Sequence, residues 1–245
     1  MGQRKNAWHY LINTDADIAL LQEATKPPDE VMAKIHVDAL PWSTAGSSNR
    51  PWRTAVVKLS DRVQLDWFEP KLIDDSGHGD LAVSRLGTLA VASVTTGSGN
   101  SFVVASMYAP WEKPHDSTNS GWIYSDASVH RVISDLSAFI GQQNKHRLIA
   151  AGDLNSLYGY GEFGSSYWAS RYATIFDRMS SLGLNFSGPQ APDGRMADPW
   201  PNELPRDSKN VPTYHTTHQK SVSATRQLDF VFHQNLLRIK LKLSL

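Results

Sequence analysis

The stretch Leu148-Ile-Ala-Ala-Gly-Asp-Leu-Asn155 decides the fold of this chain. It is an apolar run, typical of a buried strand, that ends abruptly in a carboxylate (Asp153) and a carboxamide (Asn155). Because residues i and i+2 of a strand point to the same side, both groups are predicted to face one solvent pocket from a rigid support. A carboxylate that orients water and an amide that donates hydrogen bonds suit phosphoester chemistry. Taken alone, the same residues also fit an ordinary Asp/Asn turn.

Three other apolar segments carry polar side chains at or near strand ends. Glu23 closes a second short apolar strand, and Tyr108 ends a third strand just before a proline. Asp229 lies within a fourth apolar run, where an acid is costly to bury without a partner. Open sheets build active sites from buried strands that deliver such groups at their C-terminal ends.

In chain order these segments read L-Q-E, Y-x-P, G-D-L-N and R-x-L-D-F-V-F, and in that order they resemble the endonuclease/exonuclease/phosphatase superfamily. That superfamily includes abasic-site endonucleases, DNase I-like enzymes, sphingomyelinases and inositol phosphatases. The resemblance covers residues 1–235, and four motifs in sequence are more specific than any one of them. It implies a four-layer α/β/β/α sandwich in which two mixed β-sheets pack face to face beneath outer helices. From the residues alone, helices among many short strands indicate only an α/β or α+β fold.

The resemblance also implies a role for each candidate site residue. Glu23 is the expected ligand of Mg²⁺ or Mn²⁺, since Mg²⁺ prefers oxygen ligands and keeps several waters. Asp153 is expected to orient and deprotonate the attacking water, and Asn155 to hydrogen-bond the phosphoryl oxygens. Tyr108 matches the family tyrosine whose hydroxyl reaches the scissile phosphate, although its residue type fits a half-buried aromatic equally well. Asp229 matches the aspartate that orients a catalytic histidine.

The sequence departs from the family pattern at both ends. The family closes with Ser-Asp-His, and none of the nine histidines of this chain follows an aspartate. Family members also open with a strand that ends in Asn, upstream of the segment that begins here at Met1. The resemblance therefore implies one domain over residues 1–245 that lacks the family's first strand and its last strand with Ser-Asp-His. His215 or His218 is a candidate substitute, and His215 is also a candidate substrate-binding residue.

Composition bounds the class of protein. The chain has 245 residues, of which 40% are hydrophobic, enough for one domain with a large core. No apolar stretch approaches the roughly 18 residues of a membrane span, and no apolar signal segment follows the basic N-terminus. The absence of cysteine excludes disulfides and thiolate metal sites and fits a reducing compartment, so a cytoplasmic location is expected. A net charge of zero neither supports nor excludes a nucleic-acid substrate.

Periodicity and turn residues predict the elements along the chain. Helices are predicted over 3–13, 125–143 and 168–182, and strands over 53–59, 63–68, 86–95, 101–108, 147–152, 213–217, 226–233 and 237–243. Residues 187–213, rich in Pro, Asp and Asn, are predicted to form a long surface loop. Gly159-Tyr-Gly-Glu-Phe-Gly164 satisfies G-x-G-x-x-G, but a dinucleotide site needs these glycines directly after the strand. This segment is therefore interpreted as a glycine-rich active-site loop.

The sequence thus predicts a Mg²⁺- or Mn²⁺-dependent phosphodiesterase, a nuclease-type hydrolase that uses activated water. DNA is one candidate substrate beside RNA, lipid and small phosphoesters, and the oligomeric state is left open. The alternative is a catalytically impaired, truncated family member that acts as a binding or vestigial protein. Five residues lie in segments that could either hold an extruded nucleotide or simply pack in the core and on the surface: Trp42, Trp52, Arg53, Trp111 and Trp122.

Overall fold

The computed structural model of the chain describes residues 2–43, 51–78, 80–112, 125–140, 147–216, 218 and 220–234. The chain divides into two compact units: unit 1 comprises residues 1–108 and 134–152, and unit 2 comprises residues 109–133 and 153–245. The single domain that the sequence predicts stays a prediction. No helix in the described part of the chain is both long enough and apolar enough to cross a membrane.

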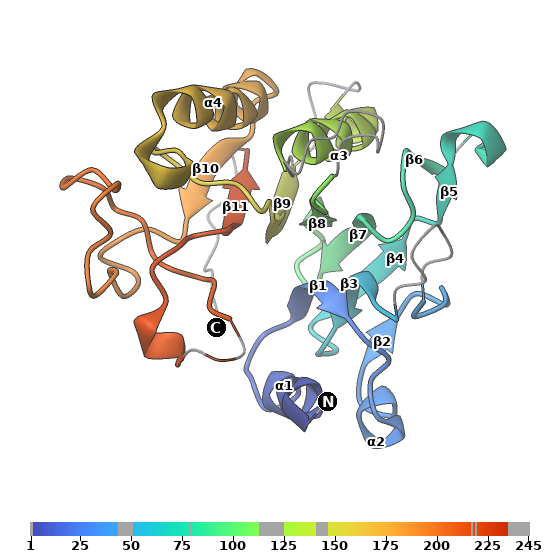
Figure 1. Ribbon diagram of the computed structural model, residues 1–245. Coiled ribbons are helices and arrows are strands. Elements are labelled where there is room, and N and C mark those ends of the chain that lie inside the picture. Colours follow the sequence, from blue (N-terminus) through green and yellow to red (C-terminus); the bar gives the residue numbers. More distant parts are fainter. Residues whose placement is uncertain are drawn as a thin grey trace. The chain divides into compact units, whose positions relative to one another are not determined.

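Unit 1 is built mainly of strands (Figure 1). Its elements are α1 (Gly2–Leu11), β1 (Ile18–Ala24), α2 (Asp29–Met32), β2 (His36–Val37), β3 (Arg53–Lys58), β4 (Val63–Trp67), β5 (Pro70–Leu72), a 3₁₀ turn (Ile73–Asp75), β6 (Leu81–Val83), β7 (Leu89–Thr96), β8 (Ser101–Tyr108) and β9 (Leu148–Asp153). The smaller sheet has the order β1-β3-β2 and is antiparallel. The larger sheet has the order β9-β8-β7-β4 within this unit, and β5 and β6 form a separate parallel pair.

The larger sheet combines antiparallel and parallel pairing. β4, β7 and β8 are antiparallel neighbours along the chain. β9 runs parallel to β8, because the bond from Val103 N to Arg147 O (2.7 Å) and the bond from Ala109 N to Asp153 O (2.9 Å) advance together along both strands. Parallel strands need a crossover connection, and α3 (Asp126–Ile140) lies in the segment that joins them.

The two sheets of unit 1 pack face to face, with β1 and β3 against β7 and β8. The helix α1 lies on the outer face of the smaller sheet (Figure 1). Its buried Trp8 packs with small and β-branched side chains of β1 and β3. On the larger sheet, Phe139 from the second half of α3 meets Phe68 edge-on, with ring centroids 4.9 Å apart. This arrangement is the α/β/β/α sandwich that the sequence predicts. Among the described strands, the larger sheet contains both parallel and antiparallel pairs, whereas the smaller sheet is antiparallel.

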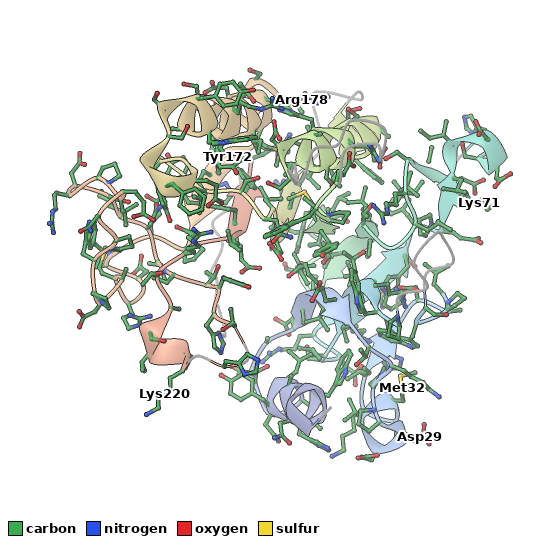
Figure 2. All side chains as sticks on the ribbon, in the orientation of Figure 1. Asp29, Met32, Lys71, Tyr172, Arg178 and Lys220 are labelled. Atoms are coloured by element: carbon green, nitrogen blue, oxygen red, sulfur yellow. The ribbon has the colours of Figure 1, made fainter. Side chains whose placement is uncertain are left out.

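Unit 2 places α4 (Ser166–Ser181) over the antiparallel pair β10 (Asn185–Gly188) and β11 (Asp229–His233). Tyr172, Ile175 and Met179 form a buried stripe at helical spacing, and Tyr172 and Arg178 mark the helix in Figure 2. The Phe176 ring lies 5.1 to 5.9 Å from three phenylalanine rings of the strands, Phe186, Phe230 and Phe232. These aromatic contacts form the core of the unit.

Most predicted helices and strands are found, and two strand predictions near the C-terminus are wrong in extent. Residues 213–216 form no regular strand, because Thr213 N and Tyr214 N both donate to the one carbonyl of Arg226, at 2.9 and 3.1 Å. The strand predicted over 226–233 begins only at Asp229 for the same reason. The short strands β2, β5 and β6 have no counterpart in the prediction. The predicted strand 237–243 and Trp122 lie outside the described residues.

Candidate active site

Glu23 and Tyr108, two of the predicted site residues, are in direct contact in unit 1. The Tyr108 hydroxyl donates a hydrogen bond to Glu23 Oε1 at 3.0 Å, across 85 residues of sequence. Tyr108 is buried and Glu23 is exposed, so the phenol reaches out of the core to hold a solvent-facing carboxylate. The packing of β1 against β8 thus joins the predicted metal ligand to the predicted phosphate contact.

Two further side chains of unit 1 support this pair. The Trp52 ring packs edge-on against Tyr108, with centroids 5.0 Å apart and an interplanar angle of 82°. Ser106, which is fully buried two residues before Tyr108, donates to Leu21 O (2.8 Å) and accepts from Gln22 Nε2 (2.9 Å). These bonds fix β1 against β8 just before Glu23. The sequence indicated Trp52 only as an aromatic of a candidate segment, and nothing in it indicated Ser106.

Asp153 and Asn155 form a turn in unit 2. Asp153 Oδ1 accepts the backbone N–H of Asn155 at 2.8 Å, and Asn155 Nδ2 donates to Ala109 O at 3.0 Å. The strand ends at Asp153, so Asn155 lies beyond it, and the two do not share one strand face as predicted. A side-chain bond to the backbone two residues on is the turn chemistry that the sequence left as an alternative. Both residues remain half-buried, and Leu154 between them is buried.

Left-handed backbone is found at one predicted site residue in each unit. Among the described residues, three that are not glycine have positive φ: Glu23 (49°), Asn155 (47°) and Phe163 (54°). Asn adopts this conformation more readily than Glu or Phe. Such strained backbone costs about 1 to 3 kcal/mol per residue and persists where the surrounding structure imposes it, often at functional sites. Two of the three are residues that sequence motifs had selected independently.

Asp229 begins β11 in unit 2. Burial raises the pKa of its carboxyl group above the ordinary value, and a hydrogen bond from Thr213 opposes that rise. Thr213 Oγ1 also accepts the backbone N–H groups of Leu228 and Asp229, each at 3.0 Å. Leu154 N donates to Leu228 O at 2.9 Å, which links this strand to the Asp153–Asn155 turn. Among the described residues, Thr213 is the side chain that bonds Asp229, where the resemblance implies a histidine.

His215 lies two residues after Thr213 in the same unit. It is half-buried, whereas His218 is exposed. The neighbouring Tyr214 bridges to Arg226, which fixes the backbone beside His215. The catalytic or substrate-binding role of His215 stays a prediction.

The side chains around Glu23 test which metal would fit. Zn²⁺ takes three or four protein ligands, whereas Mg²⁺ is held by one or two carboxylates and keeps several waters. In the part of the chain that the structure describes, no group of three or more His, Asp or Glu side chains gathers as a metal site. Glu23 is an exposed hard donor that Tyr108 orients. It is therefore the type of donor that a hydrated Mg²⁺ or Mn²⁺ ion accepts.

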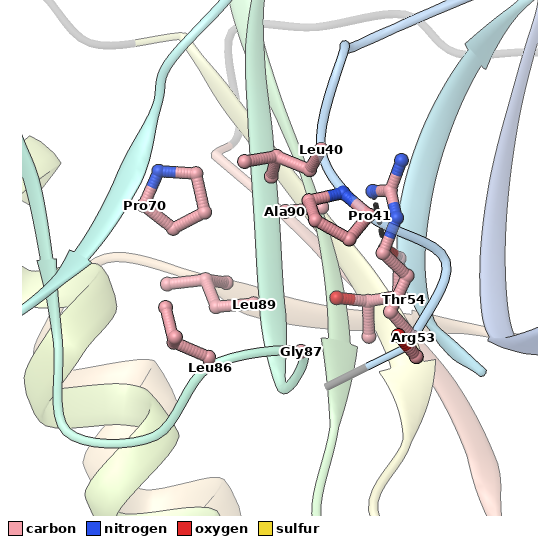
Figure 3. Close-up of a pocket in the computed structure, with 10 residues that line it drawn as sticks. Leu40, Pro41, Arg53, Thr54, Pro70, Leu86, Gly87, Leu89 and Ala90 are labelled. Atoms are coloured by element: carbon pink, nitrogen blue, oxygen red, sulfur yellow. Dashed lines mark hydrogen bonds between the residues drawn. The ribbon is translucent and has the colours of Figure 1, made fainter. Parts of the chain in front are cut away.

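A cavity of about 70 Å³ opens in unit 1 (Figure 3). Its lining is mainly apolar: Leu40, Pro41, Pro70, Leu86, Leu89 and Ala90. The buried Thr54 hydroxyl points into it in Figure 3 and has no hydrogen-bond partner among the described residues. Backbone hydrogen bonds connect the cavity lining at Thr54 to Tyr108. Thr54 N donates to Gly87 O (3.1 Å), and Tyr108 N donates to the O of the next residue, Thr88 (2.8 Å).

Arg53, beside this cavity, is a structural residue. It is 3% exposed, forms an ion pair with Asp38 at 2.8 Å and lies over the Trp42 ring at 4.4 Å from the centroid. Its charge is neutralised and its guanidinium group is covered. Of the two uses that the sequence left open for Arg53 and Trp42, packing in the core is the one observed.

Comparison with solved structures gives the fold a family context. The endonuclease domain of TRAS1, a telomere-specific non-LTR retrotransposon, matches with a TM-score of 0.55 and 16% identity over 95% of this chain and 82% of that chain. The AP endonuclease LMAP from Leishmania major matches with a TM-score of 0.52 and 13% identity over 96% of this chain and 74% of that chain. No family model and no curated protein matches the chain. The chain therefore has the endonuclease/exonuclease/phosphatase fold that its motifs resemble.

Proposed function

We propose that this protein is a divalent-metal-dependent phosphodiesterase, a nuclease-type hydrolase that cleaves a phosphodiester with activated water. The observation that carries the proposal is the left-handed backbone of Glu23 and Asn155, the residues that the motifs select as metal ligand and phosphate contact. Strain at two such positions is typical of functional sites. The fold shared with two endonucleases supports the proposal by analogy, since one fold can host several functions.

Each residue has a defined task in the proposed reaction. Asp153 takes the proton of the attacking water, and its bond to the Asn155 N–H keeps the carboxylate in one orientation. One hydrogen of the Asn155 amide is bound to Ala109 O, which orients the amide so that its second hydrogen donates to a phosphoryl oxygen. The bond from Asp229 N to Thr213 Oγ1 positions the segment that carries His215. In the proposal, the His215 side chain contacts the substrate.

Glu23 and Tyr108 are the charge-stabilising groups of the proposal. The single hydroxyl hydrogen of Tyr108 bonds Glu23 in the free protein and is redirected to the phosphate when substrate is bound. Mg²⁺ or Mn²⁺ bound at Glu23 would stabilise the negative charge that develops on the phosphoryl oxygens. DNA is the proposed substrate, by analogy with two structural matches with TM-scores above 0.5 that are endonucleases.

The second candidate is a non-enzymatic binding or vestigial protein. The observation that favours it is the partner of Asp229, which is the hydroxyl of Thr213. A threonine hydroxyl cannot shuttle protons near neutral pH as an imidazole does. On this reading the scaffold is kept and turnover is lost.

Metal-dependent hydrolysis of plasmid DNA and of an aryl phosphodiester distinguishes the two candidates. We expect turnover that requires Mg²⁺ or Mn²⁺ and a loss in Asp153→Ala of about 10² to 10⁴-fold in kcat. Glu23→Gln should shift the metal concentration needed for turnover upward. Asp61→Ala, which removes a carboxylate with 97% side-chain exposure, is the matched control and should act like the parent. A folded parent that hydrolyses neither substrate would leave the binding protein as the answer.

A further inference from the structure

The glycine loop, residues Gly159–Gly164, presents one bare aromatic ring. Phe163 is 90% exposed, the highest value of any large hydrophobic side chain in the described residues. Its backbone is left-handed, with φ 54° and ψ 29°. It follows Asn155 by eight residues, so the chain limits its distance from that residue to about 29 Å.

The loop around Phe163 is fixed on both sides. Before it, Tyr160 is buried, and a Cβ on Gly161 would come within 2.1 Å of Ser165 O, so the backbone there is packed without a gap. The side chain of Glu162 forms an ion pair with Arg226 at 3.0 Å. After it, Gly164 N donates to Gly161 O at 3.0 Å. The exposure of Phe163 is therefore imposed by a closed loop.

The backbone of Phe163 is the kind that glycine adopts without cost. Glycines at 161 and 164 flank the position, and Gly164 is itself left-handed at φ 74°. A phenylalanine there carries backbone strain and also leaves its ring in water. The two other left-handed residues that are not glycine, Glu23 and Asn155, are the proposed metal ligand and phosphate contact. Phe163 shares this left-handed backbone with them, and its ring, 90% exposed, is not buried in the core of the described residues.

We propose that Phe163 stacks on an unpaired base of a nucleic-acid substrate, an inference that rests on the proposed nuclease function. Every base offers a flat π face, so one exposed ring on a rigid loop holds single-stranded nucleic acid without sequence preference. The fixed loop reduces the ordering cost of binding. Contacts within unit 2 connect the ring to the site: Glu162 binds Arg226, whose carbonyl accepts from the backbone of Thr213, the partner of Asp229.

A second aromatic ring follows in the first turn of α4. Tyr167 is 59% exposed, and the Arg171 guanidinium lies 5.7 Å from its ring centroid and donates to its hydroxyl at 3.0 Å. Arg171 is itself paired with the buried Asp126, so it fixes the Tyr167 ring in one orientation. The segment that follows Asn155 thus offers two solvent-facing rings to a nucleic-acid strand.

Binding without turnover tests the proposal. A fluorescein-labelled oligothymidylate of about 12 nucleotides is titrated in EDTA with the parent, Phe163→Ala, Phe163→Tyr and Phe163→Gly, and binding is followed by anisotropy. A backbone of equal length and charge that carries tetrahydrofuran abasic sites is titrated in parallel. Tyr10→Ala, which removes a ring with 55% exposure from α1, is the matched control.

We expect Phe163→Ala to weaken binding of the oligothymidylate about tenfold and to leave binding of the abasic backbone unchanged. Phe163→Tyr should bind like the parent. Phe163→Gly should lose the same affinity without a lower Tm, since glycine relieves the backbone strain. Unchanged affinity in Phe163→Ala, or an equal loss on both oligonucleotides, would overturn the proposal.

Two further measurements separate this proposal from its alternatives. If Phe163→Ala loses binding to phosphatidylcholine/phosphatidylserine vesicles and keeps its affinity for the oligothymidylate, the ring is a membrane contact and the proposal is wrong. Hydrolysis of the aryl phosphodiester by the same protein samples tests the proposed phosphodiesterase function separately from base binding, because this substrate has no base. Base-dependent binding without any turnover supports the role of Phe163 and contradicts the proposed function. Turnover with no effect of Phe163→Ala on binding supports the proposed function and contradicts the role of Phe163.

Discussion

The two units of this protein support their candidate site residues in different ways. In unit 1, Glu23 is held by Tyr108 across two sheets, from strands that are 85 residues apart in sequence. In unit 2, Asp153 is held by the backbone of Asn155, two residues away. Side chains on packed strands are positioned more rigidly than side chains on turns. The difference suggests that unit 1 fixes its groups through packing and unit 2 through local hydrogen bonds.

Two glycines allow the largest test of that difference, one between packed strands of unit 1 and one in a locally bonded loop of unit 2. A Cβ on Gly152 in β9 would lie 1.8 Å from Met107 O of β8, whereas a Cβ on Gly161 in the glycine loop would lie 2.1 Å from Ser165 O. Paired strands cannot separate without breaking their ladder, so Gly152→Ala should lower the free energy of unfolding by about 3 kcal/mol or more. Gly161→Ala should lower it less, because Ser165 lies at the start of a single helix, α4, whereas β8 is paired with a strand on each side. Urea unfolding measures both.

Gly97→Ala is the control for these variants, since a Cβ there meets only Arg62 O at 3.9 Å, an ordinary contact. It should change the free energy of unfolding by no more than about 0.5 kcal/mol. An equal loss in the Gly152 and Gly161 variants would end the distinction between packed and local support.

Tyr108→Phe sharpens the comparison on the side of unit 1. The ring stays in the core and keeps its contact with Trp52, but the hydroxyl bond to Glu23 is lost. Loss of a group that orients a metal ligand typically costs about 10- to 100-fold in metal affinity or activity. We expect Mn²⁺ affinity, measured by calorimetry, to fall in that range. Tyr10→Phe on the exposed face of α1 is the control, and an unchanged Mn²⁺ affinity in Tyr108→Phe would show that Glu23 needs no such support.

Asp229→Asn tests the side of unit 2 in this comparison, through the pH dependence of stability. Burial raises the folded-state pKa of Asp229 above its ordinary value of 3.8. A raised carboxyl pKa contributes stability that is full below that ordinary value and is lost as pH rises through the raised value. Asn carries no charge to bury, so the variant should be more stable than the parent near neutral pH, with the advantage vanishing in acid. Denaturation across the range from acid to neutral pH measures it, and a difference that does not vary with pH would contradict the assigned burial.

His130→Gln gives the smallest expected effect. His130 Nε2 lies 3.0 Å from Thr174 Oγ1 and joins α3 to α4 within unit 2. Burial, and then the charge of Arg178, lower the His130 pKa below its ordinary 6.5. Stability from this group is therefore present above that ordinary value and is lost as pH falls through the lowered one. The Tm of the parent should decline more between neutral and mildly acidic pH than the Tm of the variant. A parallel decline would assign the pH dependence to other groups.

Features that depend on neighbouring residues could be predicted from the sequence. The apolar stripe at helical spacing predicts α4, and the apolar run before Asp153 predicts β9, because side-chain periodicity reports which face is buried. The Asp153-Leu-Asn155 turn was one of two interpretations, since an Asp side chain bonds backbone two residues on. The order of the four motifs led to the correct fold.

Features that depend on distant residues were decided by the tertiary structure. Nothing near Glu23 in sequence indicates that a tyrosine 85 residues later holds its carboxylate, or that Asp38 neutralises Arg53. The strand predicted over 213–217 failed because two N–H groups compete for the Arg226 carbonyl. Left-handed backbone at Glu23 and Phe163 has no local signal, since their residue types disfavour it. The sequence by itself determined the elements and the candidate residues, because short-range sterics and periodicity act along the chain. Packing between distant strands and closed loops decided which of those residues meet, because only the folded chain brings their partners within bonding distance.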